Sequence, residues 1–91
     1  MHSKDVLKEA IRRHGRILQT FVAIEEMAEL QKELSKDMRG ENNHEAILEE
    51  MADVCIMIEE LKIIHDISTR ELSQMKRKKI DRLKKKLEEE K

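Results

Sequence analysis

Apolar residues recur every three or four positions along most of the chain, and this spacing is typical of amphipathic helices. The first run predicts a short helix that stops around residues 14–15, with an apolar face made of Val6, Leu7, Ala10 and Ile11. A second helix is predicted from about residue 16 to residue 38. Its apolar stripe has a 4-3-4 spacing and consists of Ile17, Phe21, Ile24 and Ala28.

The stretch from residue 39 to residue 43 contains Gly40, two asparagines and no apolar residue, which predicts a turn. A third helix should follow from about residue 45 to residue 65. Ser68 and Glu71 have the Ser-x-x-Glu spacing of a capping box, so a fourth helix is predicted to begin there. Its stripe is an imperfect heptad of Leu72, Met75, Ile80, Leu83 and Leu87. Because a short turn joins the second and third helices, the predicted fold is all-α, a four-helix up-down arrangement.

Composition supports helices and indicates a thin core. The 91 residues include no proline and one aromatic residue, Phe21, while 43% of them are charged. A chain of this length is one domain that buries a small fraction of its surface, so it often needs a partner subunit. We therefore expect residues 1–91 to form a single helical domain, with a core at about 10–83 and a charged helical tail at 84–91. Oligomerisation should complete the core.

Charge and hydropathy argue against two classes of partner. The net charge is −1, so no overall field favours nucleic acid or a membrane surface. No apolar run approaches the roughly 20 residues of a membrane span. Cys55 is the one cysteine and lies in an apolar run, which excludes an internal disulfide and predicts a buried thiol in a reduced setting. The expected location is the cytoplasm, with neither nucleic acid nor membrane as a partner.

Two acidic clusters carry the candidate chemistry. Glu26 and Glu29 are three residues apart on the second predicted helix and therefore share a face. Glu50 and Asp53 have the same spacing on the third predicted helix. Helical spacing places these acids among apolar side chains rather than opposite them. If the two helices are antiparallel neighbours, the four carboxylates converge.

Carboxylates that converge within an apolar face need a cation, because desolvating an unpaired carboxylate is costly. A set of ligands made of carboxylate oxygens favours Mg²⁺, Mn²⁺ or Ca²⁺ over Zn²⁺. Mg²⁺ held by a few carboxylates keeps coordination positions for water and substrate phosphates, which suits phosphoryl or nucleotidyl transfer. The alternative interpretation is a solvated acidic face in a non-catalytic helical dimerisation or adaptor module.

The same residues resemble a known family. Glu-Glu-x-x-Glu at residues 25–29, followed after twenty residues by Glu-x-x-Asp at residues 50–53, is similar to the signature of MazG-like, all-α nucleoside triphosphate pyrophosphohydrolases. The segments AIEEMAEL and EEMADVCIMIEEL look like the two core helices of that family. HGRILQTFVAIEEMAEL resembles its compact single-domain versions from phages and prophages. The resemblance covers roughly residues 10–83.

This resemblance implies hydrolysis of a ribo- or deoxyribonucleoside triphosphate between its α- and β-phosphates, giving a monophosphate and pyrophosphate. The expected ligands of Mg²⁺, for which Mn²⁺ can substitute, are Glu26, Glu29, Glu50 and Asp53. The expected catalytic carboxylates are Glu25 and Glu50. The candidates for contact with the phosphates are Lys76, Lys79 and Arg82. Phe21 is expected either in the core or stacked on the nucleobase. Members of this family are dimers or tetramers whose sites use residues of two subunits.

The preferred base and sugar stay open at this point. A narrower substrate within the same superfamily, phosphoribosyl-ATP or dUTP, is a further alternative. The dUTP-specific version is generally longer, with two fused repeats of the helical unit, so a length of 91 residues argues against it.

Overall fold

The computed structural model describes residues 2–90, and every regular element in that range is an α-helix. The helices are α1 (Ser3–His14), α2 (Arg16–Met38), α3 (His44–Ile64) and α4 (Thr69–Glu89). Where the sequence predicted the start or end of a helix, the observed position lies within about one residue of it. The predicted all-α class is therefore confirmed for the described part of the chain. None of the helices within residues 2–90 is both long and apolar enough to cross a membrane.

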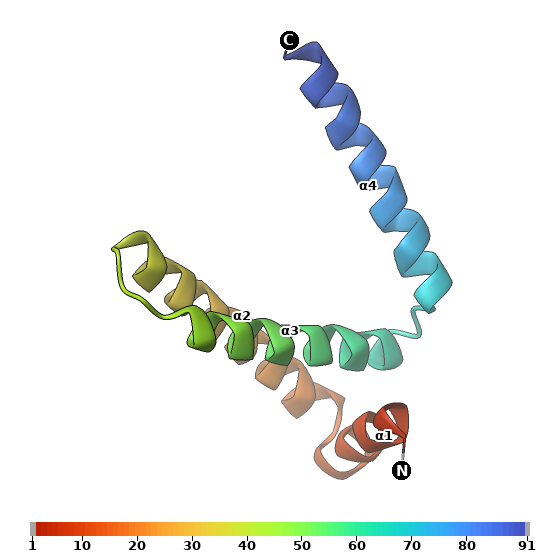
Figure 1. Ribbon diagram of the computed structural model, residues 1–91. Helices are drawn as coiled ribbons and strands as arrows, with labels where there is room; N and C mark the ends of the chain where they lie inside the picture. The colour runs from red at the N-terminus through yellow and green to blue at the C-terminus, as the bar shows by residue number, and fades with distance from the viewer. Residues whose placement is uncertain (1, 91) are drawn as a thin grey trace.

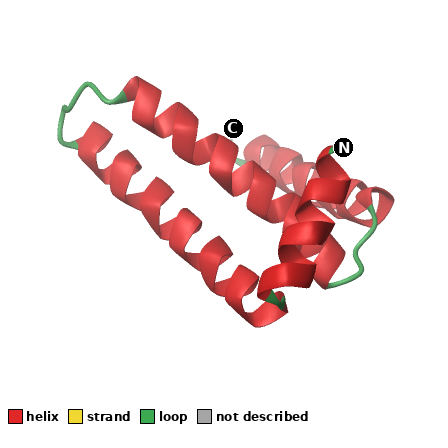
Figure 2. Ribbon diagram, turned by 90° about the horizontal axis from the view of Figure 1, so that it is seen from below, coloured by secondary structure: helices red, strands yellow, loops and turns green. Residues whose placement is uncertain are grey.

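The antiparallel pair of α2 and α3 is the centre of the fold. The two helices lie side by side and are joined by the short turn at residues 39–43 (Figure 2). At the opposite end of this hairpin, α1 packs against both of them. The chain changes direction between α1 and α2 at Gly15, whose φ of 84° is a conformation that glycine adopts without strain.

The turn between α2 and α3 is closed by backbone and side-chain hydrogen bonds. Gly40 has a φ of 87°, and the Glu41 N–H donates to the carbonyl of Lys36 at 3.1 Å, a pattern that ends helices at a left-handed residue. The Asn43 side chain then donates to the backbone carbonyl of Glu33 at 2.8 Å. These contacts hold the start of α3 against the last turns of α2.

The core of a single chain is small, as the composition predicted. Ala23, at 2% exposure, is the hydrophobic residue that is fully buried within residues 2–90. Three polar residues are also buried, namely Gln19, Glu33 and Glu60. Most of the buried residues on α2 and α3 are therefore polar.

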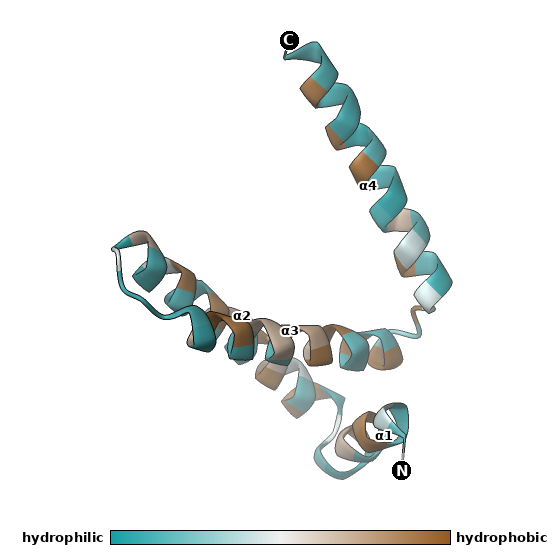
Figure 3. Cartoon of the chain, in the orientation of Figure 1, coloured by the Kyte–Doolittle hydropathy of each residue, from teal (hydrophilic) through white to brown (hydrophobic). Residues whose placement is uncertain are grey.

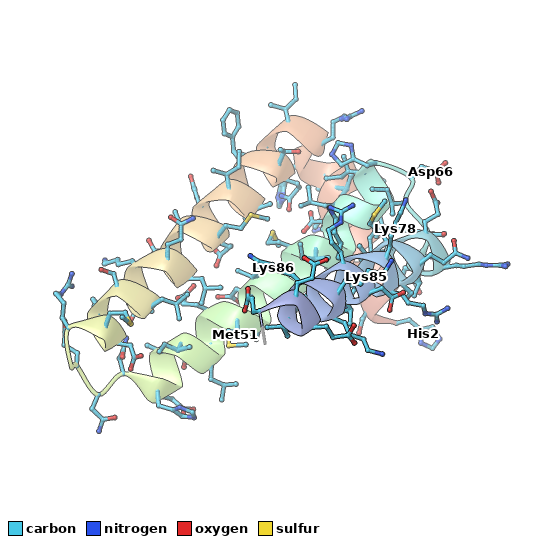
Figure 4. All side chains as sticks on the ribbon, turned by 90° about the horizontal axis from the view of Figure 1, so that it is seen from above. His2, Met51, Asp66, Lys78, Lys85 and Lys86 are labelled. Carbon is cyan, nitrogen blue, oxygen red and sulfur yellow. The ribbon has the colours of Figure 1, made fainter. Side chains whose placement is uncertain are left out.

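Two expectations about the core differ from the structure. The predicted stripe of α2 is exposed, with Ile17 at 72%, Phe21 at 58% and Ile24 at 57%, because α3 packs on the other side of the helix, along Ala23. Cys55 is also exposed rather than buried. It is four residues from Met51, which Figure 4 shows on the side of α3 that faces away from α2.

The fourth helix does not complete a bundle within one chain. Figure 1 shows α4 leaving the end of α3 and running away from the hairpin, and within residues 2–90 the extensive helix packing is among α1, α2 and α3. The predicted up-down arrangement is therefore present in α2 and α3, whereas α4 stands apart. The corner is formed at Asp66, whose φ is 53°, and at the Ser68 capping box of α4.

Candidate metal centre

Three carboxylates meet between α2 and α3. Glu26 comes from α2, and Glu50 and Asp53 come from successive turns of α3. One carboxylate oxygen from each residue lies within 4.8 Å of the other two, and all three residues are partly buried. The spacing of three residues on α3 puts its two acids on one face, and the antiparallel packing of α2 brings the third opposite them.

The charges in this group repel one another. Burial raises the pKa of Glu26 above its ordinary value. The negative charge of Asp53 and a hydrogen bond between Glu26 and the Asp53 carboxyl group raise this pKa further. Burial is also the main cause that raises the pKa of Glu50, followed by the charge of Asp53 and then that of Glu29. Because every charge that acts on these two residues is an acid, the group favours either shared protons or a cation.

One oxygen of Glu50 has no hydrogen-bond partner. Its Oε2 atom is buried and receives no donor from the described residues. A buried acceptor without a donor is unfavourable, and an ionised one more so. A divalent cation would satisfy this oxygen and neutralise the group at the same time.

The spacing of the oxygens fits such an ion. Ligand oxygens around Mg²⁺ lie about 2.1 Å from the metal, so two of them on opposite sides are about 4.2 Å apart. Oxygens that already lie within 4.8 Å of one another need only small side-chain rotations to reach that geometry. With three protein oxygens, an octahedral ion would keep positions for water and for substrate phosphates.

The fourth predicted ligand lies at the edge of the group. Glu29 is exposed and is not one of the three residues whose oxygens meet, although its charge raises the pKa of both Glu26 and Glu50. Glu25, a predicted catalytic residue, is also exposed on α2. The structure thus brings together three of the four predicted ligands and leaves Glu29 and Glu25 in solvent.

Within one chain, the residues predicted to contact the phosphates and the base do not lie at the three-carboxylate group. Lys76, Lys79 and Arg82 are exposed on α4, which runs away from the hairpin (Figure 1). Phe21 is exposed on α2 and belongs to its outer stripe. Neither set therefore lines the three-carboxylate group within a single copy.

Glu33 is a residue of this region that the sequence analysis missed. It is buried, and its carboxylate accepts hydrogen bonds from Asn43 at 3.0 Å and from Lys36 at 3.1 Å. These donors lower the pKa of Glu33, and its charge in turn raises the pKa of Glu50. Glu33 lies seven residues after Glu26, so two-turn spacing along α2 was the signal that would have found it.

Glu60 is the second missed residue, and it stands seven residues after Asp53. It is 2% exposed, and its Oε1 atom is buried without a partner. Burial raises its pKa, and the charge of the nearby His14 opposes that effect. The Gln19 amide lies 3.3 Å from the His14 ring nitrogen Nδ1. A second polar cluster therefore sits where α1 meets the hairpin.

Comparison with known proteins adds no relative. No family model, no curated protein and no solved structure matches this chain.

Proposed function

We propose that this chain is a Mg²⁺-dependent nucleoside triphosphate pyrophosphohydrolase, which cleaves a ribo- or deoxyribonucleoside triphosphate between its α- and β-phosphates. The observation that carries the proposal is the convergence of Glu26, Glu50 and Asp53, with a buried Glu50 oxygen that has no donor. The resemblance of the two acidic motifs to MazG-like enzymes supports the reaction class.

The residues of the hairpin have distinct roles in this proposal. Glu26, Glu50 and Asp53 would hold Mg²⁺, and Glu29 lies at the edge of the group as a further candidate ligand. A bound Mg²⁺ would supply charge neutralisation on the triphosphate and help to align the reacting groups. Glu25, or an oxygen of Glu50 that is free of metal, orients the attacking water and accepts its proton.

Lys76, Lys79 and Arg82 are suited to meet the pyrophosphate leaving group, because developing negative charge on phosphate is stabilised by nearby cations. Since α4 stands away from its own hairpin, these residues would reach the phosphates from a second copy. The working assembly is accordingly a homodimer or homotetramer. Exposed apolar residues on both hairpin helices support this, including Ile17, Leu18, Phe21, Ile24, Leu48, Met51, Ile56 and Ile58.

The second candidate function is a non-catalytic helical dimerisation or adaptor module. The same exposed apolar residues favour it, because large unpartnered apolar surfaces mark protein interaction sites. In that case Mg²⁺ would leave the protein unchanged. A narrower substrate, phosphoribosyl-ATP or dUTP, is a variant of the first proposal that a substrate panel resolves.

Single-residue changes at the site test the assignment. Asp53→Asn keeps the size of the side chain and removes the charge, so it should lower turnover of the preferred triphosphate by at least about a hundredfold, as the loss of an essential charged group does. The matched control is Glu49→Gln, an exposed acid next to Glu50 that lies outside the group. Equal activity in Asp53→Asn and the wild type would refute the site, provided that circular dichroism shows both chains folded.

A further inference from the structure

A small interface holds α1 against the hairpin. Figure 3 shows both hydrophobic and hydrophilic positions along this helix, and none of its residues from Ser3 to His14 is fully buried. Leu7, Ala10 and Ile11 are partly buried where α1 packs against α2 and α3. Regions with few buried apolar contacts open locally at a low cost in free energy. The docking of α1 is therefore sensitive to the polar groups at this interface.

A buried carboxylate lies at the end of the hairpin where α1 packs. Glu60 of α3 is 2% exposed, and its Oε1 atom has no hydrogen-bond partner among the described residues. Burial raises the pKa of Glu60, and the charge of His14 in α1 acts in the opposite direction. Because burial disfavours the ionised form of a carboxylate, an ionised Glu60 requires a nearby cation.

His14 is the charged group that acts on Glu60. α1 contributes His14, α2 contributes the uncharged Gln19, and no other charge within residues 2–90 acts appreciably on Glu60. Glu9 and Arg12, which also belong to α1, bind each other. The protonation state of His14 therefore decides whether an ionised Glu60 has a counter-charge.

Gln19 can bind His14 in either protonation state. The Gln19 side chain is 7% exposed, and its amide nitrogen lies 3.3 Å from Nδ1 of His14. A neutral imidazole nitrogen accepts a hydrogen bond from the amide, whereas a protonated one donates to the amide oxygen once the amide has turned over. Because a hydrogen bond to Gln19 exists in both states, the two states differ mainly in the counter-charge that they give to Glu60.

From this cluster we propose that protonation of His14 controls the docking of α1 on the hairpin. At acid pH Glu60 is neutral and α1 is docked. As the pH rises Glu60 ionises, and protonated His14 supplies its counter-charge. Histidine side chains lose their proton between about pH 5 and 8, so an ionised Glu60 then lies buried without a cation.

The release of α1 follows from that unfavourable state. When α1 loosens, water reaches the Glu60 carboxylate and removes the penalty of burying its charge. Gly15, with a φ of 84°, joins α1 to α2 and is free to change conformation as the hinge. This switch concerns the conformation of α1 and does not depend on the proposed hydrolysis.

Hydrogen exchange of the full chain, followed by mass spectrometry at about pH 5 and about pH 9, measures the docking of α1. Each rate is divided by the intrinsic exchange rate at the same pH. The amides of residues 7–14 should lose protection by at least about tenfold at the higher pH, while those in the middle of α2 change by less than about threefold. Equal protection of residues 7–14 at the two pH values would overturn the inference, and so would an equal loss in α1 and α2.

Two variants test whether Glu60 and His14 cause the change. Glu60→Gln keeps the size of the side chain and removes its charge, so α1 should keep its acid-pH protection at both pH values. This variant also separates Glu60 from the other carboxylates that titrate. His14→Gln should lose protection of α1 at a lower pH than the wild type, because Glu60 then has no counter-charge as soon as it ionises.

His44→Gln is the matched control. His44 is an exposed histidine at the opposite end of α3, so this variant should follow the wild-type profile. A wild-type profile in Glu60→Gln or in His14→Gln, with circular dichroism showing a folded chain, would refute the switch. His14→Gln changes an exposed side chain, so it decides the question if Glu60→Gln does not fold.

Discussion

Magnesium should stabilise the folded chain, because the three-carboxylate group is unfavourable without a cation. Burial and mutual repulsion raise the pKa of Glu26 and Glu50 above the ordinary value of 4.5. Above pH 4.5, the metal-free folded state therefore binds more protons than the unfolded chain. Its free energy of unfolding falls as the pH rises, until the pH has passed both raised pKa values. A metal binds the deprotonated carboxylates, so its stabilising effect grows over the same pH interval.

The size of the effect follows from the binding of an ion by the folded state alone. At a free Mg²⁺ concentration a hundredfold above the Kd, the stabilisation is about 2.7 kcal/mol. For a domain of this size, each 1 kcal/mol shifts the Tm by about 4–8 °C, so the Tm should rise by roughly 10–20 °C.

Thermal unfolding followed by circular dichroism at neutral pH, with and without Mg²⁺, measures this shift. Glu50→Gln should raise the metal-free Tm, because it removes the buried charge, and should abolish most of the Mg²⁺ effect. Glu49→Gln is the control and should keep the full Mg²⁺ effect. A Tm of the wild type that ignores Mg²⁺, or an equal Mg²⁺ shift in Glu50→Gln, would refute the reasoning about this group.

Three further predictions concern the hairpin. Asn43→Ala removes the 2.8 Å hydrogen bond to the Glu33 carbonyl. Its loss should cost about 1 kcal/mol of stability and lower the Tm by roughly 4–8 °C. An unchanged Tm would mean that this hydrogen bond does not hold the turn. Glu60→Gln should leave stability unchanged at acid pH and raise it at neutral pH. The reason is that the pKa of Glu60 is raised, so the wild type loses stability as the pH rises through that pKa. Urea titrations that give parallel pH profiles of stability for the variant and the wild type would contradict this. Gly40→Val places a branched residue at a φ of 87° and should cost about 1–2 kcal/mol by urea unfolding, while Gly40→Asn should cost less.

The helices could be predicted from the sequence because their signals are local. The capping box of Ser68 and Glu71 forms as its spacing indicated, and Gly40 ends α2 where the apolar pattern stops. The convergence of Glu50 and Asp53 with Glu26 was predictable too. It needs only helical spacing and one antiparallel neighbour.

The other features of the fold and of the site depend on contacts between helices, and the spacing of residues in the sequence does not determine these contacts. The predicted stripe of α2 contains Phe21 and Ile24, yet α3 packs on a different side of the helix, along Ala23. Glu60 was not singled out in the sequence, and it is 2% exposed at the end of the hairpin, where the charge of His14 in α1 acts on it. The direction of α4 follows from the hydrogen-bonded corner at Asp66. No sequence pattern predicted the left-handed backbone conformation of this residue.

Product analysis tests the central proposal most directly. A panel of ribo- and deoxyribonucleoside triphosphates, extended to dUTP and phosphoribosyl-ATP, is incubated with the protein with and without Mg²⁺. We expect the wild type to convert at least one substrate to its monophosphate and pyrophosphate in a Mg²⁺-dependent reaction, and Asp53→Asn to lack this activity. Release of orthophosphate would show that a different bond is cleaved. A folded protein that turns over no nucleotide and ignores Mg²⁺ would contradict the account and favour the adaptor function.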